Sequence, residues 1–407
     1  MSARTLMAAA VKTALGLGLA LSAPRAWSAD WQFNPRVELG GQADSNYRLN
    51  LPGFEDSVSG GFADVQLQLR SAGQINNFTL TPAVHATKFS SSSGDSSTDP
   101  SLDLDFAHHG LTSTLGFTGT VSKASVARTD RATTDIGGSG LGNPTGGDSG
   151  YLTIRDRRQL TMVAPSASFD LTQRSRLLLN ADYAKVDYDR EIPGVYVGSS
   201  NLDGAIGVAH EWSQRTTLTL RGRYSRYDPN GAFSTVDSYG VEGEWRRHVT
   251  QLAESYIRIG GLRSSFSRLG AAPAPDSVTS VVAGAGINWT FQITQLFLDA
   301  TRTIDPNATG FSVVRDQLRL RITKNLTPRF SVAIGARGYR DTATGKITTY
   351  RERKYLVGSL GLTWRFRRAW TLAAAYDQSW QRYQLDPSAA DSRAGTVSLV
   401  YEPNQRE

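Results

Sequence analysis

The sequence has no cysteine and no long apolar run beyond its first residues, and each absence narrows the class of protein. Without cysteine, the 407-residue chain cannot hold disulfides, thiolate zinc sites, cysteine nucleophiles, iron–sulfur clusters or an N-terminal lipid anchor. The mean hydropathy is −0.33, and no stretch after residue 28 holds the roughly 18 apolar residues that a membrane-spanning helix needs. A membrane protein built from helices is therefore not expected, whereas strands could still cross a bilayer.

Residues 1–28 have the three parts of a secretory signal peptide. Arg4 and Lys12 supply the positive start, and residues 13–21 form an apolar stretch too short to span a bilayer. Small residues at Ala26 and Ser28 predict cleavage after Ser28. We therefore expect an exported protein whose mature part is residues 29–407.

The charge balance argues against a nucleic-acid partner. The signal peptide carries three of the 44 basic residues and none of the 37 acidic residues, so the mature chain has a net charge of only +4. The charge is unevenly distributed along the chain. Residues 29–200 carry 14 basic and 19 acidic residues, and residues 201–407 carry 27 and 18.

The dominant pattern from residue 31 to residue 401 is the alternation of apolar and polar residues that is typical of β-strands. It is clearest in Leu218–Tyr224, Leu318–Ile322 and Leu356–Trp364, where every second residue is apolar and the others are largely Arg, Thr, Ser or Gly. A soluble sandwich and a membrane barrel would both show this pattern, so the connections between strands must distinguish them.

Short and long connections alternate along the whole chain. Eight short turns and nine longer loops rich in Gly, Pro, Ser and Asp would join 18 strands, with sixteen strands as the alternative because the strands before residue 130 are less regular. This predicts an all-β fold, a transmembrane antiparallel up-and-down β-barrel in the outer membrane with both termini in the periplasm. Pro82 and Pro165 lie inside predicted strands and predict bulges or breaks.

Aromatic residues gather near the predicted strand ends, as in the girdles of outer-membrane barrels. Tryptophans are expected beside the short turns, at Trp212, Trp245, Trp289, Trp364 and Trp370. Tyrosines are expected in a second girdle beside the long loops, at Tyr188, Tyr227, Tyr239 and Tyr383.

A barrel of this size would enclose water, so the inward-facing charges are the candidate functional residues. Alternation predicts a self-compensated ladder on three strands, with Arg223 near Glu242 and Arg221 near Glu244, followed by Arg258. A second, basic stripe is predicted to have only Asp299, closest to Arg315, to offset it, and would attract anions. It comprises Arg315, Arg319, Arg321, Arg337 and Arg353.

The glycine-rich segment 128–152 is the largest candidate for a loop that plugs the lumen. Catalysis is not expected, because none of the five histidines has a serine or aspartate partner at a recognisable spacing. The acidic cluster at residues 187–191 lacks the glycine and spacing of a calcium loop, so no metal or other cofactor is predicted.

The mature start, Trp31–Gly41 followed by Asp44–Leu49, and the repeated turns of the form Leu-Thr-x-Arg and Trp-x-x-x-x-Thr-x-Leu carry a family resemblance. They resemble the β-barrel porins associated with exopolysaccharide operons. The resemblance implies an outer-membrane exit pore for a secreted, anionic polysaccharide that depends on separate periplasmic and inner-membrane export proteins. Two other functions remain open at this point: a general diffusion porin for small polar or anionic solutes, and a structural or adhesive barrel with a closed lumen.

Overall fold

The computed structural model describes residues 30–90, 96–131, 154–231, 235–267, 277–344, 352–384 and 386–403. The predicted signal peptide, residues 1–28, lies outside the described residues. So do residues 132–152 of the candidate plug segment.

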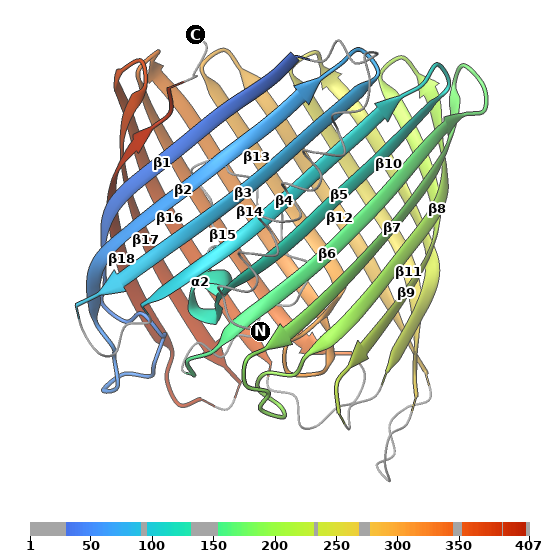
Figure 1. Cartoon of the computed structure of the whole chain (residues 1–407). Coiled ribbons are helices and arrows are strands. Elements are labelled where there is room, and N and C mark those ends of the chain that lie inside the picture. The colour runs from blue at the N-terminus through green and yellow to red at the C-terminus, as the bar shows by residue number, and fades with distance from the viewer. Residues whose placement is uncertain are drawn as a thin grey trace, which may run out of the picture.

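The described residues form one closed sheet of 18 antiparallel strands (Figure 1). Each strand pairs with its neighbours in sequence, and β1 also pairs with β18 from Val37↔Tyr401 to Asp44↔Ala394, which closes the barrel. The predicted fold is thus confirmed, and the alternative of sixteen strands is wrong. The strands are β1 Asp30–Asp44, β2 Val58–Ala72, β3 Asn76–Phe89, β4 Ser97–His109, β5 Ser113–Ser125, β6 Arg157–Asp170, β7 Ser175–Tyr188, β8 Ser199–Ser213, β9 Thr216–Pro229, β10 Val236–Thr250, β11 Ala253–Phe266, β12 Ser277–Phe291, β13 Thr294–Pro306, β14 Ser312–Thr327, β15 Phe330–Ala343, β16 Arg353–Arg367, β17 Trp370–Tyr383 and β18 Ala390–Tyr401.

The two rims of the barrel differ in the length of their connections. At one rim the strands are joined by turns of two to four residues, such as 214–215 between β8 and β9 and 171–174 between β6 and β7. At the other rim the connections are longer, and one of them begins with the short helix α2, Val126–Arg131. The longer connections lie at the lower rim of Figure 1.

The two prolines interrupt pairing without shifting the register. Pro82 pairs with Leu102 of β4, but the β2–β3 pairing skips from Gln66↔Ala83 to Leu69↔Leu80. Pro165 likewise pairs with β5, while the β6–β7 pairing is interrupted beside it. Proline has no backbone N–H to donate, so a local break rather than a bulge accommodates each one.

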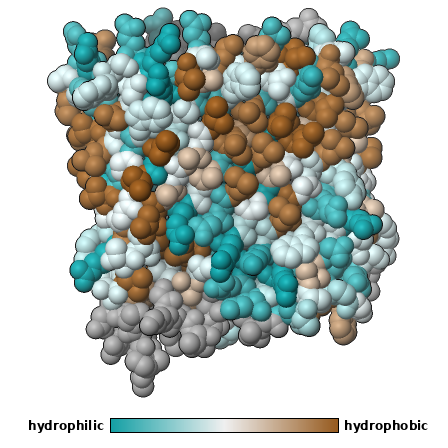
Figure 2. Space-filling model, turned by 180° about the vertical axis from the view of Figure 1, so that it is seen from behind, coloured by the Kyte–Doolittle hydropathy of each residue, from teal (hydrophilic) through white to brown (hydrophobic). Residues whose placement is uncertain are grey.

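Every second side chain along each strand points outward, and many of these side chains are apolar and exposed. Leu318 and Leu356 are each 53% exposed, and the space-filling view shows apolar side chains gathered across the face in view (Figure 2). Trp212, Trp289 and Trp364 are exposed beside the short turns, where the tryptophan girdle was predicted. An outer apolar band is what a β-barrel presents to lipid. No helix in the described part of the chain is long and apolar enough to cross a membrane.

The predicted tyrosine girdle is only partly correct. Tyr239 is 51% exposed on the outer face, but Tyr188 and Tyr227 are 8% and 4% exposed and point inward. The reason is the alternation itself: Tyr227 follows Arg221 and Arg223 at two-residue steps, so it shares their inward face.

Candidate pore-lining site

The inner wall over β8 to β11 carries the predicted ladder of ion pairs. Arg223 lies between Asp203 of β8, at 2.7 Å, and Glu242 of β10, at 3.2 Å. Arg221 lies 3.8 Å from Glu244. Both contacts match the pairs predicted from the sequence. They run diagonally between β9 and β10, because the direct cross-strand partner of Glu242 is Arg221.

Two further arginines extend the ladder. Arg258 of β11 approaches Glu242 at 3.9 Å. Arg246, which the sequence analysis did not single out, bridges Glu244 at 3.0 Å and Glu254 at 2.6 Å. It could have been found, because it continues the inward alternation of Glu242 and Glu244 by two residues.

Carboxylates offset more of the positive charge of the basic stripe than was predicted. Arg315 forms a two-pronged pair with Asp341, with nitrogen–oxygen distances of 2.7 and 2.8 Å, and Asp341 is completely buried. The expectation that Asp299 alone offsets the stripe, next to Arg315, was wrong. Asp299 pairs directly across the strands with Arg319 and lies 2.7 Å from its Nη2.

Arg337 and Arg353 are buried, at 6% and 2% exposed, and each donates a hydrogen bond to a glutamine. Arg337 Nη2 donates to Gln317 at 3.0 Å, and Arg353 Nε donates to Gln381 at 2.9 Å. Arg321, the fifth member of the stripe, is exposed to the lumen.

Tyr339 is the centre of this region. The guanidinium carbons of Arg315, Arg337 and Arg353 lie 4.4, 5.2 and 5.3 Å from the centre of its ring. Its ring also stacks on Tyr355 at 5.1 Å. Cation–π contact with a shared ring holds these three like charges close together, so this part of the stripe is packed into the wall.

The ion pairs of the inner wall differ in how far each partner is exposed. In the pairs of Arg221, Arg223 and Arg319, the arginine side chains are 28%, 29% and 38% exposed, while their Glu244, Glu242 and Asp299 partners are 8%, 6% and 3% exposed. The carboxylates thus lie against the wall, and the guanidinium groups cover them and contact water. A solute in the lumen meets positive charge first along β9–β14.

Tyr256 fixes one of these buried carboxylates. Its hydroxyl donates a short hydrogen bond to Asp299 across the intervening strand β12. Gly286 of β12 makes the crossing possible, because a Cβ at that position would lie 2.6 Å from the tyrosine ring.

Segments of the long-loop rim fold into the lumen. In one apolar cluster, Ala127 of α2 packs with Leu49 of the β1–β2 connection and with Tyr339, Tyr355, Val357 and Ala390 of β15, β16 and β18. In a second cluster, Val126 of α2 packs with residues of β6 and β7 and with Tyr196 and Ala308 of two other connections. Helix α2 therefore lies between opposite walls of the barrel and narrows the lumen.

Hydrogen bonds hold this arrangement in place. The Val197 N–H donates to the Ala308 carbonyl at 2.8 Å, and the Tyr227 hydroxyl donates to the Asn307 carbonyl at 2.9 Å. The Val126 N–H donates to the carbonyl of Asp156, whose side chain is largely desolvated. Burial raises the pKa of Asp156, against the lowering effect of hydrogen bonds from the Arg157 and Arg190 N–H groups.

The wall formed by β2 to β4 carries acidic and hydroxyl groups. Asp64 lies 3.2 Å from His85, and Asp103 accepts a hydrogen bond from Thr120 at 2.7 Å. Among the described residues, no three His, Asp or Glu side chains are placed to hold a metal ion. His85 also contacts the Thr87 hydroxyl at 2.9 Å, and nothing in this geometry provides an activated nucleophile.

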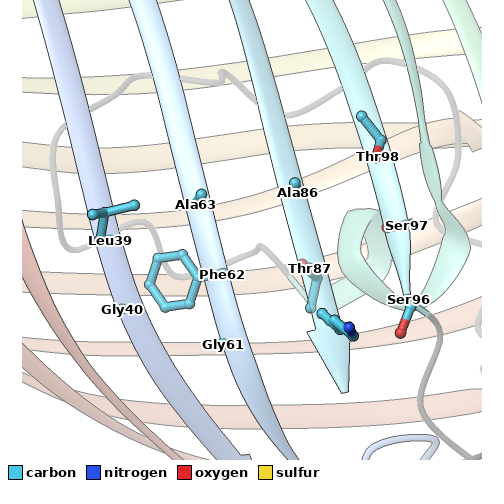
Figure 3. Close-up of a pocket in the computed structure, with 11 residues that line it drawn as sticks. Leu39, Gly40, Gly61, Phe62, Ala63, Ala86, Thr87, Ser96, Ser97 and Thr98 are labelled. Atoms are coloured by element: carbon cyan, nitrogen blue, oxygen red, sulfur yellow. The ribbon is translucent and has the colours of Figure 1, made fainter. Parts of the chain in front are cut away.

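A hollow of about 780 Å³ lies at the β1–β4 wall. It is lined mostly by small residues, and Phe62 packs between β1 and β2 where Gly40 has no side chain (Figure 3). Lys88 is its one charged lining residue among those described. The hollow therefore supplies no constellation for catalysis.

Comparison with known proteins shows a similarity of fold to solved structures. No family model and no curated protein sequence matches the chain. Among solved structures, the chain is similar to OccK2 (OpdF) of Pseudomonas aeruginosa, with a TM-score of 0.47 and 10% identity over 92% of this chain and 99% of that one. It is also similar to OprD of the same organism, with a TM-score of 0.46, 10% identity and coverage of 92% and 97%.

A third similar structure is the outer membrane channel DcaP of Acinetobacter baumannii, with a TM-score of 0.45, 9% identity and coverage of 92% and 97%. The chain has a porin-like architecture, and its closed strand pairing and outer apolar band establish this without the comparisons. The expected link to exopolysaccharide operons gains no support from these channels.

Proposed function

We propose that this barrel is an outer-membrane diffusion channel for small polar solutes, and that it favours solutes carrying negative charge. The supporting observation is the row of partly exposed arginines lying over buried carboxylates on β9–β14. Positive groups at the lumen surface raise the local concentration of anions, and guanidinium groups pair readily with carboxylates and phosphates.

The small size of the solute follows from the segments inside the lumen. Helix α2 and the connections that carry Leu49, Tyr196 and Ala308 occupy space that an 18-stranded barrel would otherwise leave to water. A single sugar or an organic acid needs a much narrower path than a hydrated polymer chain.

Export of an exopolysaccharide, which the sequence resemblance implies, would require a wider path. The contacts of Val126 and Ala127 with opposite walls would have to separate before a polymer could pass. The diffusion channel needs no such change, and for this reason we favour it.

Liposomes containing the purified barrel test the proposal through their swelling in isotonic solutions. We expect a monosaccharide acid to enter faster than the neutral sugar of equal size, and a polysaccharide to be excluded. Replacing Arg321 with glutamine should slow the acid by about fivefold and leave the neutral sugar unchanged, since one unit charge at about 4 Å in water contributes about 1 kcal/mol.

Lys324→Gln is the matched control, because Lys324 lies on the same strand but on the outer face. It should leave both rates unchanged. Equal entry of the acid and the neutral sugar into wild-type liposomes would contradict the anion preference, and no entry of either would instead support a closed structural barrel.

A further inference from the structure

A row of charged side chains crosses the outer face of five neighbouring strands. Arg302, Asp316, Arg340, Lys354 and Arg382 lie on β13 to β17, and each is the direct cross-strand partner of the next. All except Asp316 are positively charged. Direct partners in an antiparallel sheet have side chains about 5 Å apart on the same face, so this is a continuous row.

These side chains point to the outside of the barrel. They share the alternation of the outer residues Leu318 and Leu356, and the side chains of Arg302 and Arg340 are 48% and 52% exposed. Their neighbours along the same strands, such as Arg315 beside Asp316 and Arg353 beside Lys354, face inward and are buried. The outer row is therefore distinct from the pore-lining stripe, although both lie on the same strands.

The positive charges of the row outnumber the carboxylates that pair with them. Arg302 pairs with Asp316 at 3.3 Å, and Arg340 pairs with Glu352 at 2.8 Å. Lys354 and Arg382 have no ion-pair partner among the described residues. Four cations and two carboxylates leave a net charge of +2 on this patch.

The row lies at the edge of the apolar band, on the side of the long connections. The next row of outward residues is Ala300, Leu318, Gly338, Leu356 and Trp380, each again paired with its neighbour. Along β16, Lys354 and Trp364 mark the two edges, ten residues apart. At about 3.3 Å per residue and a tilt of about 40°, this is a height of about 25 Å, which is the height of the lipid-facing band in outer-membrane barrels.

The two edges differ in chemistry. At the short-turn edge the same sector presents Phe330, Trp364 and Leu372. The space-filling view shows hydrophilic side chains below the apolar region, toward the long connections, and others at the upper rim (Figure 2). A charged row at one edge and aromatic and apolar side chains at the other match a membrane whose two leaflets have different headgroups.

We infer that this row is a binding surface for the phosphorylated headgroup of lipopolysaccharide in the outer leaflet. The guanidinium and ammonium groups would pair with the phosphates, while the acyl chains would lie along the neighbouring apolar rows, on the side of the short turns. The assignment also places the long connections at the cell surface. It concerns the outer wall, so it holds or fails separately from the proposed transport function.

The test measures binding of rough lipopolysaccharide to the purified barrel and to the triple variant Arg340→Gln, Lys354→Gln, Arg382→Gln. Each cation beside an anionic surface contributes about fivefold in affinity, so the triple variant should bind roughly a hundredfold more weakly. Lys324→Gln, on the outer face at the opposite edge, should bind within twofold of wild type. A shift in gel mobility on heating verifies that each variant is a folded barrel.

Three further probes separate the sources of phosphate. Dephosphorylated lipopolysaccharide should bind weakly to wild type, phosphatidylglycerol vesicles should bind less tightly than lipopolysaccharide, and inorganic phosphate should not compete. Equal binding of wild type and triple variant would overturn the proposal. So would equal affinity for phosphatidylglycerol, which would indicate a general anionic surface, or displacement by inorganic phosphate, which would indicate a site for the free ion.

Discussion

At the scale of single residues, Asp341 is a buried charge on which the stability of the barrel should depend strongly. Its carboxylate is fully buried and accepts both bonds of the Arg315 pair. Removing one partner of a buried pair costs about 3–5 kcal/mol, because the remaining charge loses its compensation. We therefore predict that Asp341→Asn lowers the free energy of unfolding by about that amount in a urea titration.

Asp170→Asn provides the comparison, because the Asp170–Arg176 pair has the same 2.7 Å separation but side chains that are 41% and 52% exposed. Exposed pairs contribute about 0–1 kcal/mol, so this variant should unfold almost like wild type. Equal effects of the two substitutions would show that burial does not govern the strength of the Arg315–Asp341 pair.

The sequence allows much of this residue-level arrangement to be predicted. Alternation places Arg223 and Glu242 on the inward faces of β9 and β10. Counting each strand from its own short turn brings the two residues to a similar height, although a longer connection joins the two strands. The same counting applied to β15 would have placed Asp341 inward with Arg337. The sequence could not show how deeply each inward-facing side chain is buried. Whether an inward-facing arginine contacts water or packs against Tyr339 depends on which loops fold into the lumen.

At the scale of elements, α2 packs between opposite walls of the barrel and narrows the lumen. Val126 is 1% exposed in its apolar cluster, so an aspartate there would bury an unpaired charge at a cost of several kcal/mol. We predict that Val126→Asp releases α2 from its position and raises the single-channel conductance. Val126→Ile keeps the apolar contact and should conduct like wild type.

An unchanged conductance in Val126→Asp, with the barrel still folded, would show that α2 does not limit the path. The sequence analysis assigned plugging to segment 128–152, whose greater part lies outside the described residues. The inward packing of Leu49, Tyr196 and Ala308 was not predicted, although apolar residues in otherwise polar loops are a signal for it. Strand alternation describes only the wall, and the packing of loops across a lumen depends on contacts between distant parts of the chain.

At the scale of the whole molecule, the number of strands and their order were predictable because each strand pairs with its neighbours in the sequence. Among the strand pairs of the described residues, only β1 with β18 joins segments that are distant in the sequence. The absence of water in a bilayer requires that closure, because the edge strands would otherwise have unpaired backbone groups. The outer cation row was missed because the sequence analysis treated outward positions as uniformly apolar or aromatic. The inference that the row binds lipopolysaccharide rests on its position at one edge of the apolar band, and that position is visible only when all strands are in register.

The anion preference of the lumen should depend on salt. Pairing of solute carboxylates with lumen arginines at the water interface weakens as the Debye length falls from about 10 Å at 0.1 M to about 3 Å at 1 M. The preference for a monosaccharide acid over its neutral counterpart should therefore decline at high salt in the swelling experiment. A preference that persists at high salt would point to selection by shape instead of charge.

The most direct test of the central claim is the reversal potential of the purified wild-type barrel in a planar bilayer under a gradient of potassium chloride. Arginines lying over buried carboxylates along β9–β14 predict a stable conductance and a reversal potential whose sign shows chloride to be more permeant than potassium. A reversal potential of the opposite sign, or a bilayer that does not conduct, would contradict the proposed anion-preferring channel.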